Sequence, residues 1–121
     1  MVLLDSNIII YLRDPRYSDR ILEEIGTKRV STCNVIVSEV LGYREINTTE
    51  YEYFNDFFSA VKNHMFDSEV TNKVIAIRRE RKIKLSDAII AATACVNNAV
   101  LWTHNLEDFQ GIDGLQLFDP I

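Results

Sequence analysis

Residues 86–103, with the sequence SDAIIAATACVNNAVLWT, decide the fold. The helix predicted after Ser86 is apolar on nearly every side, and helices of this kind lie inside a protein rather than on its surface. Ser86 is in position to cap this helix, and Ala99–Thr103 follows as a strand rich in residue types found in buried sheets. A buried helix that leads into a buried strand is typical of α/β domains.

Short apolar strands alternate with helices on both sides of this segment. Val2–Leu4 forms a strand that ends on Asp5, and Ser6 or Asn7 can cap a helix that carries Ile8–Leu12. Other strands are predicted around residues 29–32, 64–66 and 115–118, with the last at a sheet edge. Further helices are predicted from Ser18 to Gly26, from Asn34 toward Tyr43, from a capping box of Thr49 and Glu52, and from about Ser68.

This alternation predicts one domain over residues 1–121, a three-layer α/β/α sandwich with a short, mainly parallel sheet. In such folds the functional site lies at the carboxyl ends of the strands. No apolar run exceeds five residues and no signal peptide is recognisable, so we expect a cytoplasmic protein that does not enter a membrane. Cys33 and Cys95 lack the spacing of a metal or disulfide motif, which predicts two small buried hydrophobic residues.

The 121 residues include 18 acids and 13 bases, and the resulting net charge is −5. This balance argues against non-specific coating of a polyanion, because such binding depends on basic side chains that release counterions. Most of the acids lie on polar helix faces, but four interrupt or flank apolar runs. These four are Asp5, Glu39, Asp87 and Asp108.

Carboxylates in apolar surroundings are costly to desolvate, and two of them 4 Å apart repel by about 4 kcal/mol at an effective dielectric constant of about 20. Mg²⁺ or Mn²⁺ would remove this conflict, because both ions prefer oxygen ligands. Zinc is disfavoured because neither His64 nor His104 has a partner at a ligand spacing. A magnesium-type site suits phosphoryl chemistry, since the ion activates water and neutralises the leaving oxygen.

Each of the four acids also has an ordinary structural interpretation. Asp5 could cap a helix, Asp87 could be a first-turn acid favoured by the helix dipole, and Glu39 could lie on a solvated stripe. Taken singly, each acid fits a structural role about as well as a functional one. The joint arrangement at the ends of predicted elements favours a metal site.

The sequence resembles PIN-domain ribonucleases, and in size and motif spacing the VapC-type toxins of toxin–antitoxin pairs. Four motifs in order carry the resemblance: Asp5-Ser6-Asn7 after the first strand, Glu39 in STCNVIVSEVLGY, Asp87 in LSDAIIAATA, and Thr103, Asn105, Asp108 and Phe109 in VLWTHNLEDF. Ser6 replaces a common threonine, His104 replaces a frequent arginine, and the ending FDPI departs from the usual asparagine-proline-aromatic tail. Glu107 is an alternative to Asp108 as the fourth acid.

The resemblance implies metal-dependent endonucleolytic hydrolysis of RNA. The four acids would be the catalytic residues and would hold one or two Mg²⁺ or Mn²⁺ ions. The residues that would position ligands, water or phosphate are Ser6, Asn7, Thr103 and Asn105. The resemblance further implies a cognate antitoxin as partner, and we expect a homodimer.

RNA binding needs bases, and five of the 13 are concentrated just before Asp87: Arg78, Arg79, Arg81, Lys82 and Lys84. They predict a basic rim beside an acidic pocket, although cations at a solvated helix end have the same pattern. Five aromatic residues lie within eight positions, namely Tyr51, Tyr53, Phe54, Phe57 and Phe58. This is more than one helix face can bury, so we expect some of them to contact a second copy or an antitoxin.

Two other functions compete with this interpretation. A PIN-like module that binds RNA or protein without cleaving has no need of repelling carboxylates, and metal-dependent cleavage would distinguish it from an enzyme. A phosphoacceptor receiver domain needs paired acids after its first strand and a late lysine, whereas Asp5 stands alone and no lysine follows Lys84.

Overall fold

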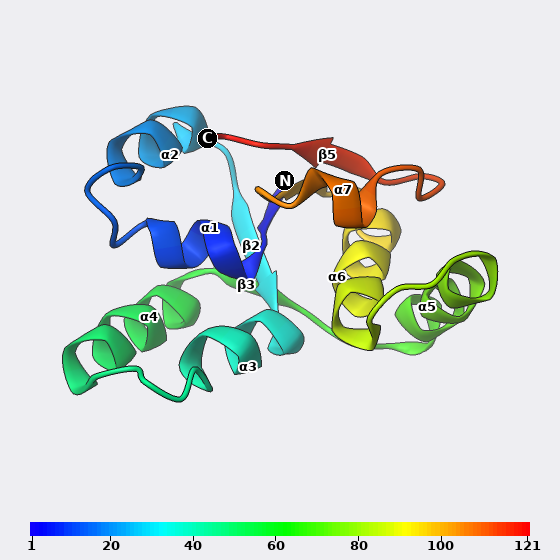
Figure 1. The fold of residues 1–121 in the computed structure, drawn as a ribbon, viewed down its shortest axis with the longest axis horizontal. Coiled ribbons are helices and arrows are strands. Elements are labelled where there is room, and N and C mark those ends of the chain that lie inside the picture. Colours follow the sequence, from blue (N-terminus) through cyan, green and yellow to red (C-terminus); the bar gives the residue numbers. More distant parts are fainter.

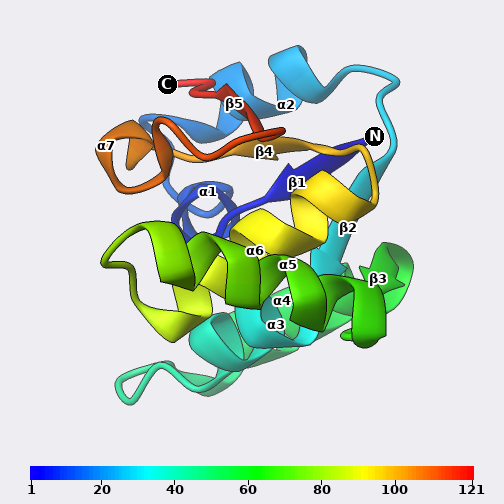
Figure 2. The same cartoon turned by 90° about the vertical axis from the view of Figure 1, so that its right-hand side faces the viewer.

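The computed structural model describes all 121 residues and contains one sheet of five parallel strands in the order β3-β2-β1-β4-β5 (Figures 1 and 2). The strands are β1 Val2–Leu4, β2 Val30–Cys33, β3 Lys62–His64, β4 Val100–Trp102 and β5 Gln116–Phe118. The predicted α/β class is confirmed. The sheet is entirely parallel, including its edge strand β5.

Seven helices surround the sheet: α1 Ser6–Tyr11, α2 Ser18–Ile25, α3 Asn34–Leu41, α4 Thr48–Ala60, α5 Ser68–Glu80, α6 Leu85–Val96 and α7 Leu106–Phe109. Helices α1 and α2 lie on one face, and α6 covers the other with α5 outside it (Figures 1 and 2). Helix α3 packs against α1, α4 and α6. No helix is long and apolar enough to span a membrane.

The central helix α6 is buried as its composition predicts. Every residue from Ala88 to Ala94 is buried, because α6 lies between the sheet and α5. Strands β1 and β4 lie next to it in the core, with Leu3, Leu4 and Leu101 fully buried. The quoted segment therefore forms the middle of the core.

Several predicted helix caps are wrong, although the helices themselves are present. Asp5 caps α1 through its side chain, as its structural interpretation predicts, whereas Ser6 and Asn7 do not. The capping box of α4 consists of Asn47 and Glu50, two residues earlier than predicted. Helices α2, α3 and α6 have no side-chain cap, so Ser18, Asn34 and Ser86 do not fill that role.

Other differences are local. Strand β3 occupies residues 62–64 rather than 64–66, and Met65 and Phe66 are exposed. Cys33 is buried as predicted, whereas Cys95 is only partly buried. Gly26 ends α2 as predicted and adopts a positive φ of 52°, which glycine tolerates better than residues with a Cβ atom.

Candidate metal-binding active site

The parallel sheet brings distant sequence segments together at the carboxyl ends of its strands. Strands β1 and β4 are neighbours, with Leu4 paired to Trp102. The residues that follow these two strands, Asp5 and Thr103, are therefore adjacent although 98 positions separate them. The backbone continues this pairing, because the Asp5 N–H donates to the Trp102 carbonyl at 2.9 Å.

Asp5 is the most enclosed carboxylate of the site, with a relative exposure of 6%. Its Oδ1 accepts a hydrogen bond from the Ser6 backbone N–H at 2.8 Å, and its Oδ2 accepts one from Thr103 Oγ1 at 2.8 Å. Burial raises the pKa of Asp5, and the charges of Glu39 and Asp87 raise it further against the effect of the two hydrogen bonds. The cap of α1 and the predicted site residue are thus the same carboxylate.

Glu39 projects from α3 toward the first turn of α1. Its Oε1 accepts a hydrogen bond from Ser6 Oγ at 2.6 Å. Ser6 therefore contacts two of the predicted acids, donating from its backbone to Asp5 and from its hydroxyl to Glu39. The hydroxyl suffices for this contact, so serine can replace the threonine common in the related motif.

Asp87 lies in the first turn of α6 and is partly buried. Burial is the largest cause that raises the pKa of Asp87, followed by the charges of Asp108 and Glu39, while Lys84 lowers it. Glu107 is not among the causes, although it lines the same pocket as Asp87 and Asp108. Of the two candidates for the fourth acid, Asp108 is the one whose charge acts on Asp87.

The four predicted acids form one electrostatic group, which we call the acidic cluster: Asp5, Glu39, Asp87 and Asp108. Neither ion pair of the protein includes any of them, since Arg16 pairs with Asp14 and His104 with Asp119. A group of repelling carboxylates without an ion pair to lysine or arginine matches the oxygen-rich donor set that hard divalent cations prefer. The donor types thus fit Mg²⁺ or Mn²⁺. In this structure, no three acidic, histidine or cysteine side chains lie close enough together to hold one ion.

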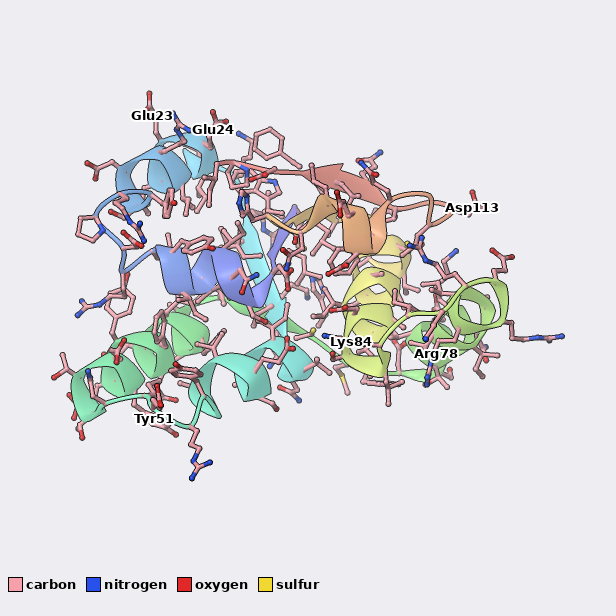
Figure 3. All side chains as sticks on the ribbon, in the orientation of Figure 1. Glu23, Glu24, Tyr51, Arg78, Lys84 and Asp113 are labelled. Carbon is pink, nitrogen blue, oxygen red and sulfur yellow. The ribbon has the colours of Figure 1, made fainter.

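A pocket of about 560 Å³ adjoins the acidic cluster. Its acidic wall contains Asp87, Glu107 and Asp108. Its basic wall contains Arg78, Arg81, Lys82 and Lys84. Figure 3 shows two of these bases, Arg78 on α5 and Lys84 next to the start of α6. Arg79 is exposed and does not line the pocket.

The supporting residues are not equally engaged. Thr103 Oγ1 donates to Asp5 and accepts from the Asn105 backbone N–H at 3.1 Å, so it links β4 to the start of α7. Asn105 is the N-cap residue of α7, but its side chain makes no capping hydrogen bond. Asn7 is partly buried on α1. His104, at the position of the frequent arginine, pairs instead with Asp119 at 2.9 Å and so ties down the divergent FDPI tail.

One polar contact near the site is not predicted from the sequence. Arg81 Nη1 donates to the Gln110 carbonyl at 2.5 Å, so α5 is connected to the residues just after α7. No local pattern signals this contact, because its two partners lie 29 residues apart. Only the packing of α5, α6 and α7 brings them together.

Comparison with known proteins agrees with the α/β fold. Residues 2–115 match the protein family described as PIN domain. No curated protein sequence matches the chain. A chain in the toxin–antitoxin complex from Klebsiella pneumoniae is 27% identical with a TM-score of 0.81, over 100% of this chain and 98% of that chain.

Two further solved structures are similar over nearly their whole length. A chain of VapBC-1 from nontypeable Haemophilus influenzae is 26% identical with a TM-score of 0.78, over 99% of this chain and 98% of that chain. A chain of the DNA-bound VapBC from Salmonella typhimurium is 20% identical with a TM-score of 0.83, over 100% of both chains. At that lower identity the likeness concerns the fold alone.

Proposed function

The chain belongs to the PIN-domain family, and from this premise we propose that it is a metal-dependent endoribonuclease and the toxin of a toxin–antitoxin pair. The acidic cluster supports this proposal most, because its carboxylates repel one another and have no ion pair with lysine or arginine. A fold that needed these acids only for stability would gain from separating or neutralising them.

The residues of the acidic cluster would hold one or two Mg²⁺ or Mn²⁺ ions. When bound, such an ion supplies an activated water and neutralises charge on the departing 3′ oxygen of the cleaved phosphodiester. The chain's own contribution is to fix the ligands. Thr103 Oγ1 and the Ser6 N–H hold both oxygens of Asp5, and Ser6 Oγ holds one oxygen of Glu39. Asn7 and Asn105 are placed in the supporting role with Ser6 and Thr103.

The pocket beside the acidic cluster would receive the RNA backbone. Arg78, Lys82 and Lys84 line it together with the acids, so phosphates could approach the metal ligands without crossing a purely negative surface. Arg79 lies outside the pocket, so its charge would contribute only to the long-range electrostatic attraction of RNA. We thus propose that the substrate is RNA and that the protein acts in the cytoplasm. Cleavage would occur where the RNA backbone passes along the acidic and basic walls of the pocket.

A cleavage assay tests the proposal directly. The purified protein is incubated with single-stranded and structured RNAs in Mg²⁺, in Mn²⁺ and in EDTA. We expect cleavage only with metal, and we expect Asp87→Asn to abolish it. The matched control is Glu23→Gln, which neutralises an exposed acid on α2, well apart from Lys84 and the start of α6 in Figure 3. This control should retain full activity.

Two results would contradict the proposal in different ways. Cleavage that persists in EDTA or in the Asp87→Asn variant would show that the acidic cluster is not the catalytic site. RNA binding without cleavage of any RNA under any metal condition would instead favour the catalytically silent binding module.

We also propose a cognate antitoxin and a homodimer as the partners. The similar chains from Klebsiella pneumoniae and Haemophilus influenzae come from a toxin–antitoxin complex and from VapBC-1, which supports the first partner. On α4, Phe54 is buried while Tyr51 and Tyr53 remain exposed, which supports a contact surface there. Co-purification with the product of a neighbouring gene, together with inhibition of cleavage, would test the antitoxin. Sedimentation equilibrium would test the dimer.

A further inference from the structure

Arg81 follows the last residue of α5 and extends toward the segment that carries Asp108. Its Nη1 donates to the Gln110 carbonyl at 2.5 Å, and its Nη2 lies 3.5 Å from the Asp108 carbonyl oxygen. The side chain is partly buried. Its guanidinium is therefore directed at main-chain carbonyls even though it lines the basic wall of the pocket.

The two carbonyls belong to the end of the short helix α7. The last carbonyls of a helix have no partner within the helix and need donors from elsewhere. A guanidinium suits this need, because its planar fork can donate to two oxygens at once and its charge strengthens each bond. A four-residue helix has little stability of its own. An external clamp is thus a substantial part of what holds α7 in place.

The chain just after this helix end is held as well. Gly111 has a φ of 84°, so the backbone turns sharply next to the clamped carbonyls. Two residues later, Lys73 Nζ donates to the Asp113 carbonyl at 3.0 Å. Helix α5 thus contacts residues 108–113 through two separate cations, of which only Arg81 contacts the Asp108 residue.

We infer that Arg81 is a positioning residue: by holding the carbonyls of Asp108 and Gln110, it keeps the Asp108 carboxylate beside Asp87, and it does not itself bind RNA. The inference rests on the proposed function, because it assigns Asp108 to the metal ligands. Arg81 differs in this respect from the other cations of the basic wall, because none of them has a hydrogen bond to residues 108–110. These cations are Arg78, Lys82 and Lys84.

The clamp is tested first in the metal-free protein, by amide hydrogen exchange of Arg81→Met. We expect faster exchange in residues 106–111 than in the wild type, since α7 loses its external donor. Lys73→Met is the matched control, because it removes the neighbouring contact to Asp113 and should leave residues 106–110 protected. Equal exchange at 106–111 in Arg81→Met and wild type would overturn the inference.

The consequence for the metal site is tested by Mn²⁺ titration of four proteins: wild type, Arg81→Met, Asp108→Asn and the double variant. We expect Arg81→Met to weaken Mn²⁺ binding by about 10- to 100-fold, as losses of outer-sphere support do. In the Asp108→Asn background the same change should have no effect, because the residue that Arg81 positions is already removed. The inference would be overturned if Arg81→Met lowered Mn²⁺ affinity equally with and without Asp108→Asn. It would also be overturned if Arg81→Met alone left Mn²⁺ affinity unchanged.

Two further measurements separate this role from general stability and from RNA contact. Arg81→Lys retains the charge but cannot fork, so we expect partial recovery of both exchange protection and Mn²⁺ affinity relative to Arg81→Met. In EDTA, the salt dependence of RNA binding should be unchanged in Arg81→Met, and a smaller slope would contradict the inference. Failure of the wild type to bind Mn²⁺ would refute the proposed function and the metal role of Arg81, whereas normal Mn²⁺ binding with unchanged exchange refutes the clamp alone.

Discussion

Asp87 has a carboxylate in surroundings that oppose its charge. Burial and the charges of Asp108 and Glu39 raise its pKa, and no hydrogen bond counteracts them. We therefore expect Asp87→Asn to stabilise the metal-free protein by about 1 kcal/mol, a size common for a single improved charge, while it abolishes RNA cleavage. Urea unfolding in EDTA measures the first effect. A variant that is both inactive and less stable would contradict the expectation that Asp87 lowers the stability of the fold while it supports cleavage.

The same acids predict how stability depends on pH. Burial is the main cause that raises the pKa of Asp5 and Asp87 in the folded protein, so the native state binds more protons than the unfolded chain above the ordinary value of 3.8. Stability falls with pH wherever the native state binds more protons. The free energy of unfolding contributed by these groups should therefore fall as pH rises from about 4 through the raised pKa values.

A comparison of variants isolates this effect from all other titrating groups. Urea unfolding is measured between pH 4 and 7 in EDTA for the wild type and for Asp5→Asn/Asp87→Asn. The stability advantage of the double variant should grow with pH across this window. A constant difference would mean that neither carboxyl titrates at a raised pKa.

At the scale of whole elements, the capping box of α4 gives a discriminating test. Asn47 Oδ1 accepts from the Glu50 N–H at 2.8 Å, whereas Thr49 and Glu52 lie inside the helix. Asn47→Ala should lower the free energy of unfolding by about 1 kcal/mol, as the loss of an N-cap does. Thr49→Ala should have a smaller effect or raise stability, because alanine favours helix interiors. The urea midpoints of the two variants decide between the caps.

The sequence predicts which elements exist better than it predicts their ends. Helix α6 and strand β4 follow from apolar runs whose burial needs no further information. Caps depend instead on which of several adjacent polar residues faces the first turn, and Asp5 rather than Ser6 or Asn7 does so at α1. Local propensity cannot rank such neighbours, because each side chain carries an oxygen that can accept from the N–H groups of the first turn.

The candidate site likewise has residues that the sequence indicates and contacts that it does not. The order of motifs indicates the four acids, since each has a marked place at the end of an element or on an apolar helix. The contacts that orient them, from Ser6 to Glu39 and from Arg81 to the end of α7, join residues 27 or more positions apart. Such pairs depend on how helices pack, which periodicity does not encode.

At the scale of the whole molecule, the net charge of −5 does not argue against an RNA substrate. Outside the acidic cluster, acids and bases nearly balance, and several bases line the pocket next to it. We expect neutralising Lys82 and Lys84 together to reduce the salt dependence of RNA binding by about 0.7 per lost phosphate contact. Fluorescence anisotropy in EDTA measures the slope. Arg79→Met, outside the pocket, is the control, and an equal change there would mean that only net charge matters.

The pairing of Asp5 with Thr103 sets a condition on when the protein can act during its synthesis. Asp5 leaves the ribosome about a hundred residues before Thr103 and Asp108. Until then β1 lacks its neighbour β4, and Asp5 lacks one of its two hydrogen-bond donors. A nascent chain therefore cannot assemble the site, and the ribosome that makes this nuclease is not exposed to it before Thr103 and Asp108 have been translated.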